Sequence, residues 1–131
     1  MKAPTVSLLT IFGLSILIAT PAKSEMIPVT ASENGDRSYY VDKNSITFDR
    51  NFVEASIDIK YKTPSSDGVS SVTTRWKVNC SYRSRMTIGS AYYDLKGNFL
   101  GSNRKPSGWS AVTLGAVDEG IYYFMCDQFR R

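Results

Sequence analysis

Two long segments of the chain alternate between apolar and polar residues, and this period of two constrains the fold more than any other feature. The first runs from Asn51 to Lys62 (NFVEASIDIKYK) and the second from Val69 to Tyr82. Successive side chains of a β-strand point to opposite faces, so each segment predicts a strand with one buried face and one wet face. Strands of this kind are typical of antiparallel sheets. In the second segment, the residues expected on the core side are Val72, Thr74, Trp76, Val78, Cys80 and Tyr82.

Shorter strands are expected on either side of two turn signals. Asn34-Gly35 favours a turn between two short strands near the start of the domain, and Lys96-Gly97-Asn98 favours a tight hairpin later in the chain. Gly89 interrupts an apolar segment that leads into this hairpin. A glycine at such a place predicts a β-bulge or a close approach of two backbones.

The last segment, Thr113 to Phe129, changes to helical spacing, with two acidic residues early in the run. Gly120 weakens this interpretation, and a buried strand over Ile121 to Cys126 remains the alternative. We therefore predict an α+β fold, in which an antiparallel sheet of about six strands carries a C-terminal helix.

Residues 1–24 have the parts of an export signal: a basic start at Lys2, an apolar run, a Thr20-Pro21 break and small residues before Glu25. Cleavage after Ala22 or Ser24 is expected, and an uncleaved N-terminal anchor is the alternative. No cysteine lies near the cut, so we expect no lipid anchor. The mature domain would be residues 25–131, located in the periplasm or outside the cell, with no membrane span.

The two cysteines, Cys80 and Cys126, are predicted to form a disulfide, because an exported chain meets an oxidising compartment. The bridge would pin the helix onto the sheet, and the chain-entropy estimate of its contribution to stability is about 4 kcal/mol. Removing Lys2 and Lys23 with the signal lowers the formal net charge from +4 to +2. This small balance gives no reason to expect a nucleic acid partner.

The chain contains no histidine. Zinc sites, Ser-His-Asp triads and Cys-His dyads are therefore not expected, and neither is a cofactor. Lys-assisted serine chemistry and a carboxylate pair stay formally open, although nothing in the sequence brings such residues together. We expect a protein that is not an enzyme.

Several short motifs resemble the surface-adhesin E family of small exported bacterial proteins. They are YYVDKNSI (Tyr39 to Ile46), SIDIKYK, WKVNCSYRSR (Trp76 to Arg85), YYDLKGN, and a lone Trp109 ahead of the closing cysteine. The resemblance covers roughly Asp36 to Gln128. It implies an antiparallel sheet with a disulfide-tied C-terminal helix, and some family members resemble adhesins that bind host extracellular proteins. The chain lacks the lipoprotein cysteine that would anchor a surface adhesin, and this is a departure from the adhesin role.

A basic surface is the first candidate for partner binding. Arg75, Lys77, Arg83 and Arg85, with Arg104 and Lys105 nearby, could form a patch for an anionic partner. The alternative is an ordinary solvated strand face whose charges are offset by Glu54, Asp58 and Asp94.

Tyrosines supply the second candidate, because eight of them occur in one small domain. In the pairs Tyr39-Tyr40 and Tyr92-Tyr93, one ring must point outward if the pair lies in a regular strand. We take Tyr40 and Tyr93 as candidate binding residues, since outward tyrosines beside arginines are typical of protein contact surfaces. The alternative is ordinary packing, and both Trp76 and Trp109 are assigned to the core.

Three functions follow from these observations. The preferred one is an exported, non-enzymatic domain that binds another protein through its sheet face, and a homodimer is left open. The second is a periplasmic inhibitor or small-ligand-binding protein that uses a loop such as Ser102 to Trp109. The third is a hydrolase that uses carboxylates.

Overall fold

The computed structural model describes residues 24–129. All of the predicted export signal except Ser24 lies outside these residues. One antiparallel sheet organises the described chain, and its eight strands exceed the expected number because two of them, β3 and β8, are very short. The strands are β1 Met26–Ala31, β2 Arg37–Asp42, β3 Thr47–Asp49, β4 Phe52–Tyr61, β5 Ser71–Asn79, β6 Ser84–Tyr93, β7 Phe99–Asn103 and β8 Ser110–Ala111.

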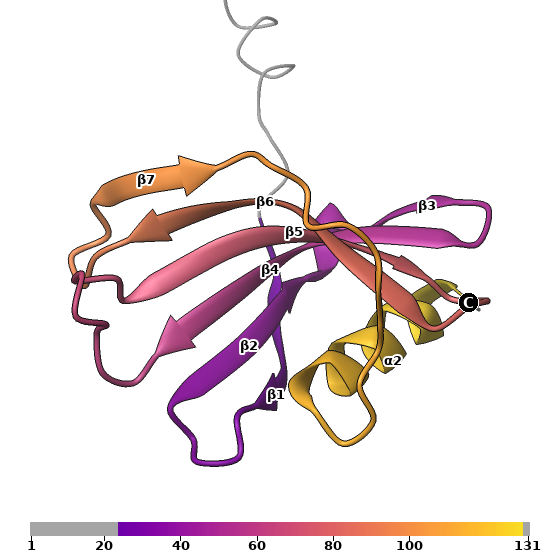
Figure 1. Ribbon diagram of the computed structural model, residues 1–131, viewed down its shortest axis with the longest axis horizontal. Coiled ribbons are helices and arrows are strands. Elements are labelled where there is room, and N and C mark those ends of the chain that lie inside the picture. The colour runs from indigo at the N-terminus through magenta and orange to yellow at the C-terminus, as the bar shows by residue number, and fades with distance from the viewer. Residues whose placement is uncertain (1–23, 130–131) are drawn as a thin grey trace, which may run out of the picture.

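The strand order is β1-β2-β4-β5-β6-β7, with β3 beside β4 and β8 beside β6. A short 3-10 turn, η1 (Lys43–Ser45), connects β2 to β3, and the helix α2 (Val117–Phe129) follows β8. Figure 1 shows α2 beside the β1 and β2 end of the sheet, with β7 at the opposite margin. The α+β architecture, the antiparallel sheet and the C-terminal helix are confirmed.

The alternating pattern of β4 and β5 buries one face of the sheet, as the sequence predicted. Val53, Ala55 and Ile57 of β4 and Trp76 and Val78 of β5 pack in the core. The helix contributes a second set of buried residues to the same cluster: Ile121, Tyr122, Met125 and Cys126. We call the sheet surface that faces α2 the inner face, and the opposite surface the outer face.

The beginning of α2 is held by its own acidic residues. Asp118 Oδ2 accepts a hydrogen bond from the Thr113 backbone at 3.3 Å, and Glu119 Oε1 accepts one from the Gly115 backbone at 3.1 Å. Negative charge at a helix N-terminus also interacts favourably with the helix dipole. Gly120 lies where α2 meets β1, since a Cβ placed on it would come 3.1 Å from Cβ of Thr30. The glycine that weakened the sequence-based helix prediction thus permits the helix to pack closely.

A β-bulge in β6 changes the face to which its residues point. Arg75 pairs with Gly89, and the next residue, Trp76, pairs with Thr87, so Ile88 has no partner in β5. A Cβ on Gly89 would also lie 3.2 Å from the backbone oxygen of Asn103. Both roles considered for this glycine, a bulge and a close approach, therefore occur. Side chains of β6 before and after Ile88 alternate in opposite phase.

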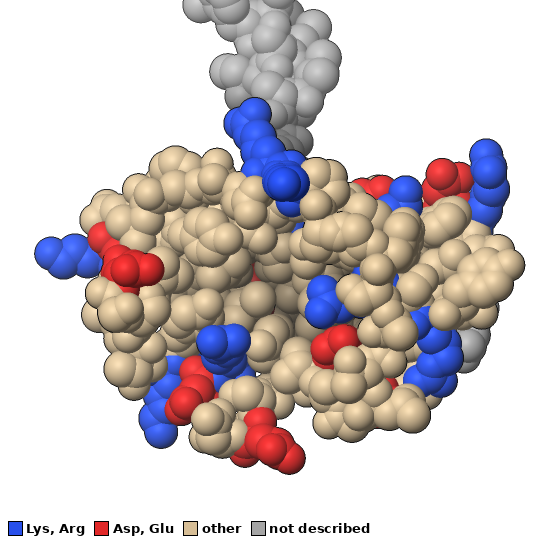
Figure 2. Space-filling view, viewed as in Figure 1, with Lys and Arg blue, Asp and Glu red and all other residues tan. Residues whose placement is uncertain are grey.

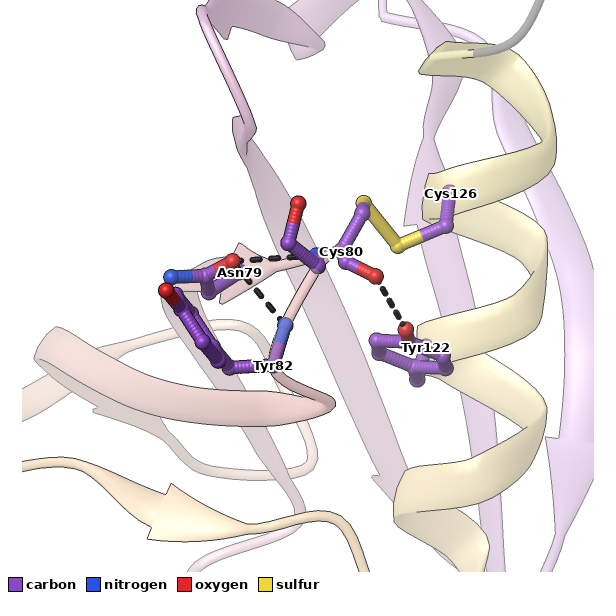
Figure 3. Close-up of a disulfide and its surroundings, with 6 residues drawn as sticks. Asn79, Cys80, Tyr82, Tyr122 and Cys126 are labelled. Atoms are coloured by element: carbon purple, nitrogen blue, oxygen red, sulfur yellow. Dashed lines mark hydrogen bonds between the residues drawn. A yellow bond between two sulfur atoms is a disulfide. The ribbon is translucent and has the colours of Figure 1, made fainter.

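Two aromatic residues assigned to the core are exposed, which corrects the sequence-based prediction. The strand that was expected to reach Tyr82 ends at Asn79, and Tyr82 lies 80% exposed in the following turn. The side-chain Oδ1 of Asn79 accepts the backbone N–H groups of Ser81 and Tyr82, which turns the chain away from the sheet (Figure 3). Trp109 is 47% exposed, whereas Trp76 is in the core as predicted, with 5% of its surface exposed.

Candidate functional site

The disulfide joins Cys80, just after β5, to Cys126 at the start of the last turn of α2. The two α-carbons are 5.7 Å apart, within the range that a disulfide requires. Figure 3 shows the bridge between the end of the strand and the helix, with the Tyr122 ring beside it. Both cysteines are consumed, and the described residues hold no other thiol. The predicted staple between helix and sheet is confirmed.

Arg75 lies on the outer face and is held in a network of acceptors. Its Nε donates to Glu54 Oε1 at 3.1 Å, and its Nη2 lies 3.3 Å from both the Ser45 backbone oxygen and Thr47 Oγ1. A guanidinium with this many partners fixes η1 and β3 against the sheet. Arg75 therefore fits the alternative interpretation, in which the positive charges of the strand face are neutralised by neighbouring carboxylates such as Glu54.

Arg83 and Arg85 point toward α2 instead of joining Arg75 and Lys77. Arg85 pairs with Val78 across the strands and lies on the inner face, because the bulge at Ile88 reverses the phase of β6. Its guanidinium lies 4.7 Å from the centre of the Trp76 ring. Its Nε is 3.5 Å from Asp118 Oδ2, an ion pair that lacks hydrogen-bond geometry.

Arg83 extends this contact from the turn between β5 and β6. Its Nη1 donates to the Tyr123 hydroxyl at 3.1 Å, and its guanidinium lies over the rings of Tyr122 and Tyr123. The hydrogen bond to Tyr123 raises the pKa of Arg83 above its usual value. The four predicted cations thus form no single patch: one pair lies on the outer face, and the other pair holds the helix.

Charge on the face seen in Figure 2 is likewise of both signs. Lys and Arg side chains lie near Asp and Glu side chains around its margin and also close to its centre, with mostly uncharged surface between these groups. This distribution gives no broad field of one sign on that face.

The outer face instead gathers aromatic rings, each with a cation or a second ring. Tyr40, which alternates with buried Tyr39, lies beneath Lys60 Nζ at 5.5 Å. Tyr93 packs edge-on against Phe99 of β7, with ring centres 6.0 Å apart. The predicted outward orientation of Tyr40 is confirmed, and four of the six candidate binding residues share this face: Tyr40, Arg75, Lys77 and Tyr93.

The third aromatic group lies at the start of β4. Lys77 Nζ is 4.9 Å from the centre of the Phe52 ring. The centres of the Phe52 and Trp109 rings are 5.8 Å apart. Sequence reasoning placed Trp109 in the core and did not single out Phe52. Phe52 could have been found, since it shares the wet phase of Glu54 in the alternating strand. Trp109 belongs to a loop, and no periodic signal indicates where its ring lies.

A groove of about 590 Å³ opens beside this face. Its lining includes Ser56, Thr73, Arg75, Ala91, Phe99 and Arg104. The groove is open to solvent, and its residues offer hydroxyl groups, two guanidinium groups and one aromatic ring. The described residues contain no group of three or more side chains placed to hold a metal ion.

The fold and this surface define a class: a small single-sheet domain with a disulfide-linked helix on one face and an aromatic-rich outer face. The sequence matches the family Surface-adhesin protein E over residues 27–127. The chain therefore belongs to the surface-adhesin protein E family. No curated protein sequence matches it significantly.

Solved structures of Haemophilus influenzae protein E have the same fold. Crystal form II aligns with a TM-score of 0.60 and 18% identity, over 86% of this chain and 94% of that chain. Another structure of protein E gives a TM-score of 0.60 and 20% identity, over 84% and 89% of the two chains. A structure of protein E from non-typeable Haemophilus influenzae gives 0.52 and 18%, over 85% and 81%. These comparisons give no support to the homodimer that the sequence left open.

Of the helices in the described part of the chain, none has the length and apolar character needed to cross a bilayer.

Proposed function

We propose that this chain is an exported, non-enzymatic adhesin-like domain that binds another protein through its outer face. Membership of the surface-adhesin protein E family supports the adhesin-like role. The signal-like residues 1–24 support export to the periplasm or the cell exterior, without a lipid anchor.

The observation that carries the proposal is the group formed by Phe52, Lys77 and Trp109. Trp109 leaves 47% of its surface exposed although it is large and mostly apolar. Tryptophan and tyrosine are among the residues that contribute most at protein interfaces, because their rings bury a large area with few rotatable bonds. Tyr40 with Lys60 and Tyr93 with Phe99 extend the same chemistry across the sheet.

A capture experiment tests the proposal. The exported protein, purified from producing cells, would be immobilised and exposed to extracellular-matrix proteins and to envelope extract. We expect saturable capture of one protein, weakened about tenfold or more by Trp109→Ala and less by Lys77→Ala. Leu114→Ala is the matched control. Leu114 is also a large apolar residue and is 71% exposed, but it lies in the loop before α2 and is not part of the Phe52, Lys77 and Trp109 group. Equal capture by Trp109→Ala and by the unaltered protein would contradict the proposal.

A second candidate, a small-ligand-binding protein, is favoured by the open groove that contains Arg75 and Arg104. The loop between Asn103 and β8 is tied to β6, because the Ser107 and Thr87 backbones are hydrogen-bonded at 2.9 Å. Arg104, the first residue of this loop, lines the groove. Saturable binding of a small anion, lost in Arg104→Ala, in a protein that captures no macromolecule would favour this alternative.

A further inference from the structure

The strand β7 is the margin of the sheet farthest from the helix. It ends the strand order, whereas the other terminal strand, β1, is contacted by α2. Four of its five residues are exposed, and Figure 1 shows it along the upper margin. Within the described chain, no other strand pairs with its free edge.

The sequence of β7 lacks most of the features that normally protect such an edge. Natural sheet edges carry lysine, other charged residues or proline, which prevent pairing with a further strand. Phe99–Asn103 reads FLGSN and contains none of these. A bulge at Leu100, where the pairing with β6 shifts, is the only protective feature in this strand. From Gly101 onward the edge is open to an added strand.

Grooves lie on both faces of the sheet at β7. Ala91 lines the groove of about 590 Å³ already described, here called the Arg104 groove. Tyr92 lines a second groove of about 410 Å³ together with Asp67, Val69 and Leu100, here called the Leu100 groove. Thr73 and Ala91 of the Arg104 groove pair with each other on the outer face, whereas Tyr92 pairs with the buried Val72 on the inner face. The two grooves therefore lie on opposite faces of the sheet.

The two grooves differ in chemistry. The lining of the Arg104 groove includes two arginines and no carboxylate. Arg75 is engaged by Glu54, whereas Arg104 forms no ion pair within the described residues. The Leu100 groove offers an aromatic ring and two aliphatic side chains, with one carboxylate, Asp67. One groove therefore suits an anionic side chain, and the other suits an apolar one.

We infer that β7 accepts an extended segment of a partner protein as an added strand, with acidic and apolar side chains in alternation. The backbone of the segment would pair with the free edge of β7, and its alternate side chains would enter the two grooves. This combination of backbone pairing and alternating pockets is an established way to bind extended peptides. The inference rests on the proposed function and names the kind of segment that such a partner would present.

A peptide titration tests the inference. The probe is a short, end-capped peptide of alternating aspartate and valine, added to the exported protein and followed by amide NMR shifts and hydrogen exchange. We expect shifts and slower exchange at Gly101 to Arg104. Arg104→Glu removes the charged hydrogen bond between Arg104 and an aspartate of the peptide, so it should weaken binding about tenfold or more. Lys96→Glu, the same charge change at an exposed lysine in the turn before β7, should weaken it much less.

Two control peptides sharpen the result. Methylation of alternate backbone nitrogens on the strand-pairing side removes the donors, and it should abolish binding while the side chains stay unchanged. Replacement of each aspartate by lysine should also abolish it. Equal binding of the methylated peptide, or shifts confined to another surface, would overturn the inference. So would slow exchange at β7 that needs no peptide and rises with protein concentration, because a second copy would then occupy the edge.

The two proposals can fail separately. If Trp109→Ala abolishes protein capture while the peptide does not bind β7, the outer face is the binding surface and the inference is wrong. If the peptide binds β7 but the protein captures no macromolecule, the inference holds as peptide recognition and the proposed function is wrong.

Discussion

The phenol of Tyr122 donates a hydrogen bond of 2.8 Å to the backbone oxygen of Cys80. Tyr122 lies one helical turn before Cys126, so the helix holds the end of β5 twice, once through sulfur and once through this hydroxyl (Figure 3). The Tyr122 ring also supports the guanidinium of Arg83 at 5.5 Å. A disulfide, a hydrogen bond and a cation–aromatic contact therefore join α2 to the end of β5 at the same place.

Loss of the disulfide should destabilise the domain strongly. The bridge closes a loop with a sequence separation of 46. On the chain-entropy model, Cys80→Ala/Cys126→Ala should lower the free energy of unfolding by about 4 kcal/mol. Denaturant titration of the double variant and the oxidised parent measures the difference. An unchanged midpoint would show that the bridge contributes nothing.

Removal of one hydroxyl should have a smaller effect at the same place. Tyr122→Phe keeps the ring beneath Arg83 but leaves the Cys80 oxygen without its donor. We expect a loss of about 1 kcal/mol in the free energy of unfolding, measured in urea with the disulfide intact. Tyr123→Phe, at a ring that is about half exposed, serves as the comparison and should cost less. A larger loss of stability in Tyr123→Phe than in Tyr122→Phe would contradict the role given to the Tyr122 hydroxyl.

Gly120→Ala should destabilise the protein although alanine favours a helix over glycine by about 1 kcal/mol. The new methyl group would lie 3.1 Å from Cβ of Thr30, closer than two such carbons normally approach. Overpacking of this kind costs about 1–3 kcal/mol, so we expect a net loss of up to about 2 kcal/mol. Thermal unfolding of Gly120→Ala, Thr30→Gly and the double variant tests the contact. The double variant should be more stable than the sum of the single effects predicts.

Arg85→Ala should lower stability by about 1 kcal/mol, because it removes the cation over Trp76 and the ion pair with Asp118. Arg85→Lys should restore only part of the loss, since an ammonium group lacks the planar stacking surface. Chemical denaturation measures both, and Lys60→Ala, an exposed change on the outer face, should stay close to the parent. A stable Arg85→Ala variant that loses partner capture would instead make Arg85 a binding residue.

Acid should loosen the hairpin between β6 and β7. Asp94 accepts hydrogen bonds from the backbone and side chain of Asn98 and from the backbone of Lys96, and these lower its pKa. A carboxyl whose pKa is lower in the folded chain stabilises above its unfolded pKa. That stabilisation is lost as the pH falls through the folded value, here below about pH 4.

Asp94→Asn provides the control for this titration. It should unfold at a lower temperature than the parent near neutral pH, and the two melting temperatures should converge in acid. Thermal melts between neutral and strongly acidic pH measure the difference. If the two melting temperatures still differ in acid, the negative charge on Asp94 is not the cause of the difference.

Sequence periodicity determined most of the fold. The alternation in Asn51 to Lys62 and in Val69 to Asn79 is local, and it identifies buried and wet faces before any partner strand is known. The two cysteines of an exported chain indicated the bridge, and the change of period after Thr113 indicated the helix. These features depend on residues that are neighbours along the chain or on a single covalent bond.

The tertiary structure decided the surface. One unpaired residue, Ile88, reverses the phase of β6, so Arg85 faces the helix and the predicted basic patch is divided. The path of the loop before β8 brings Trp109 to Phe52, although the two are far apart in sequence and no periodic pattern links them. Bulges and loop paths depend on which backbones pair at long range, and a reading of local pattern contains no such information.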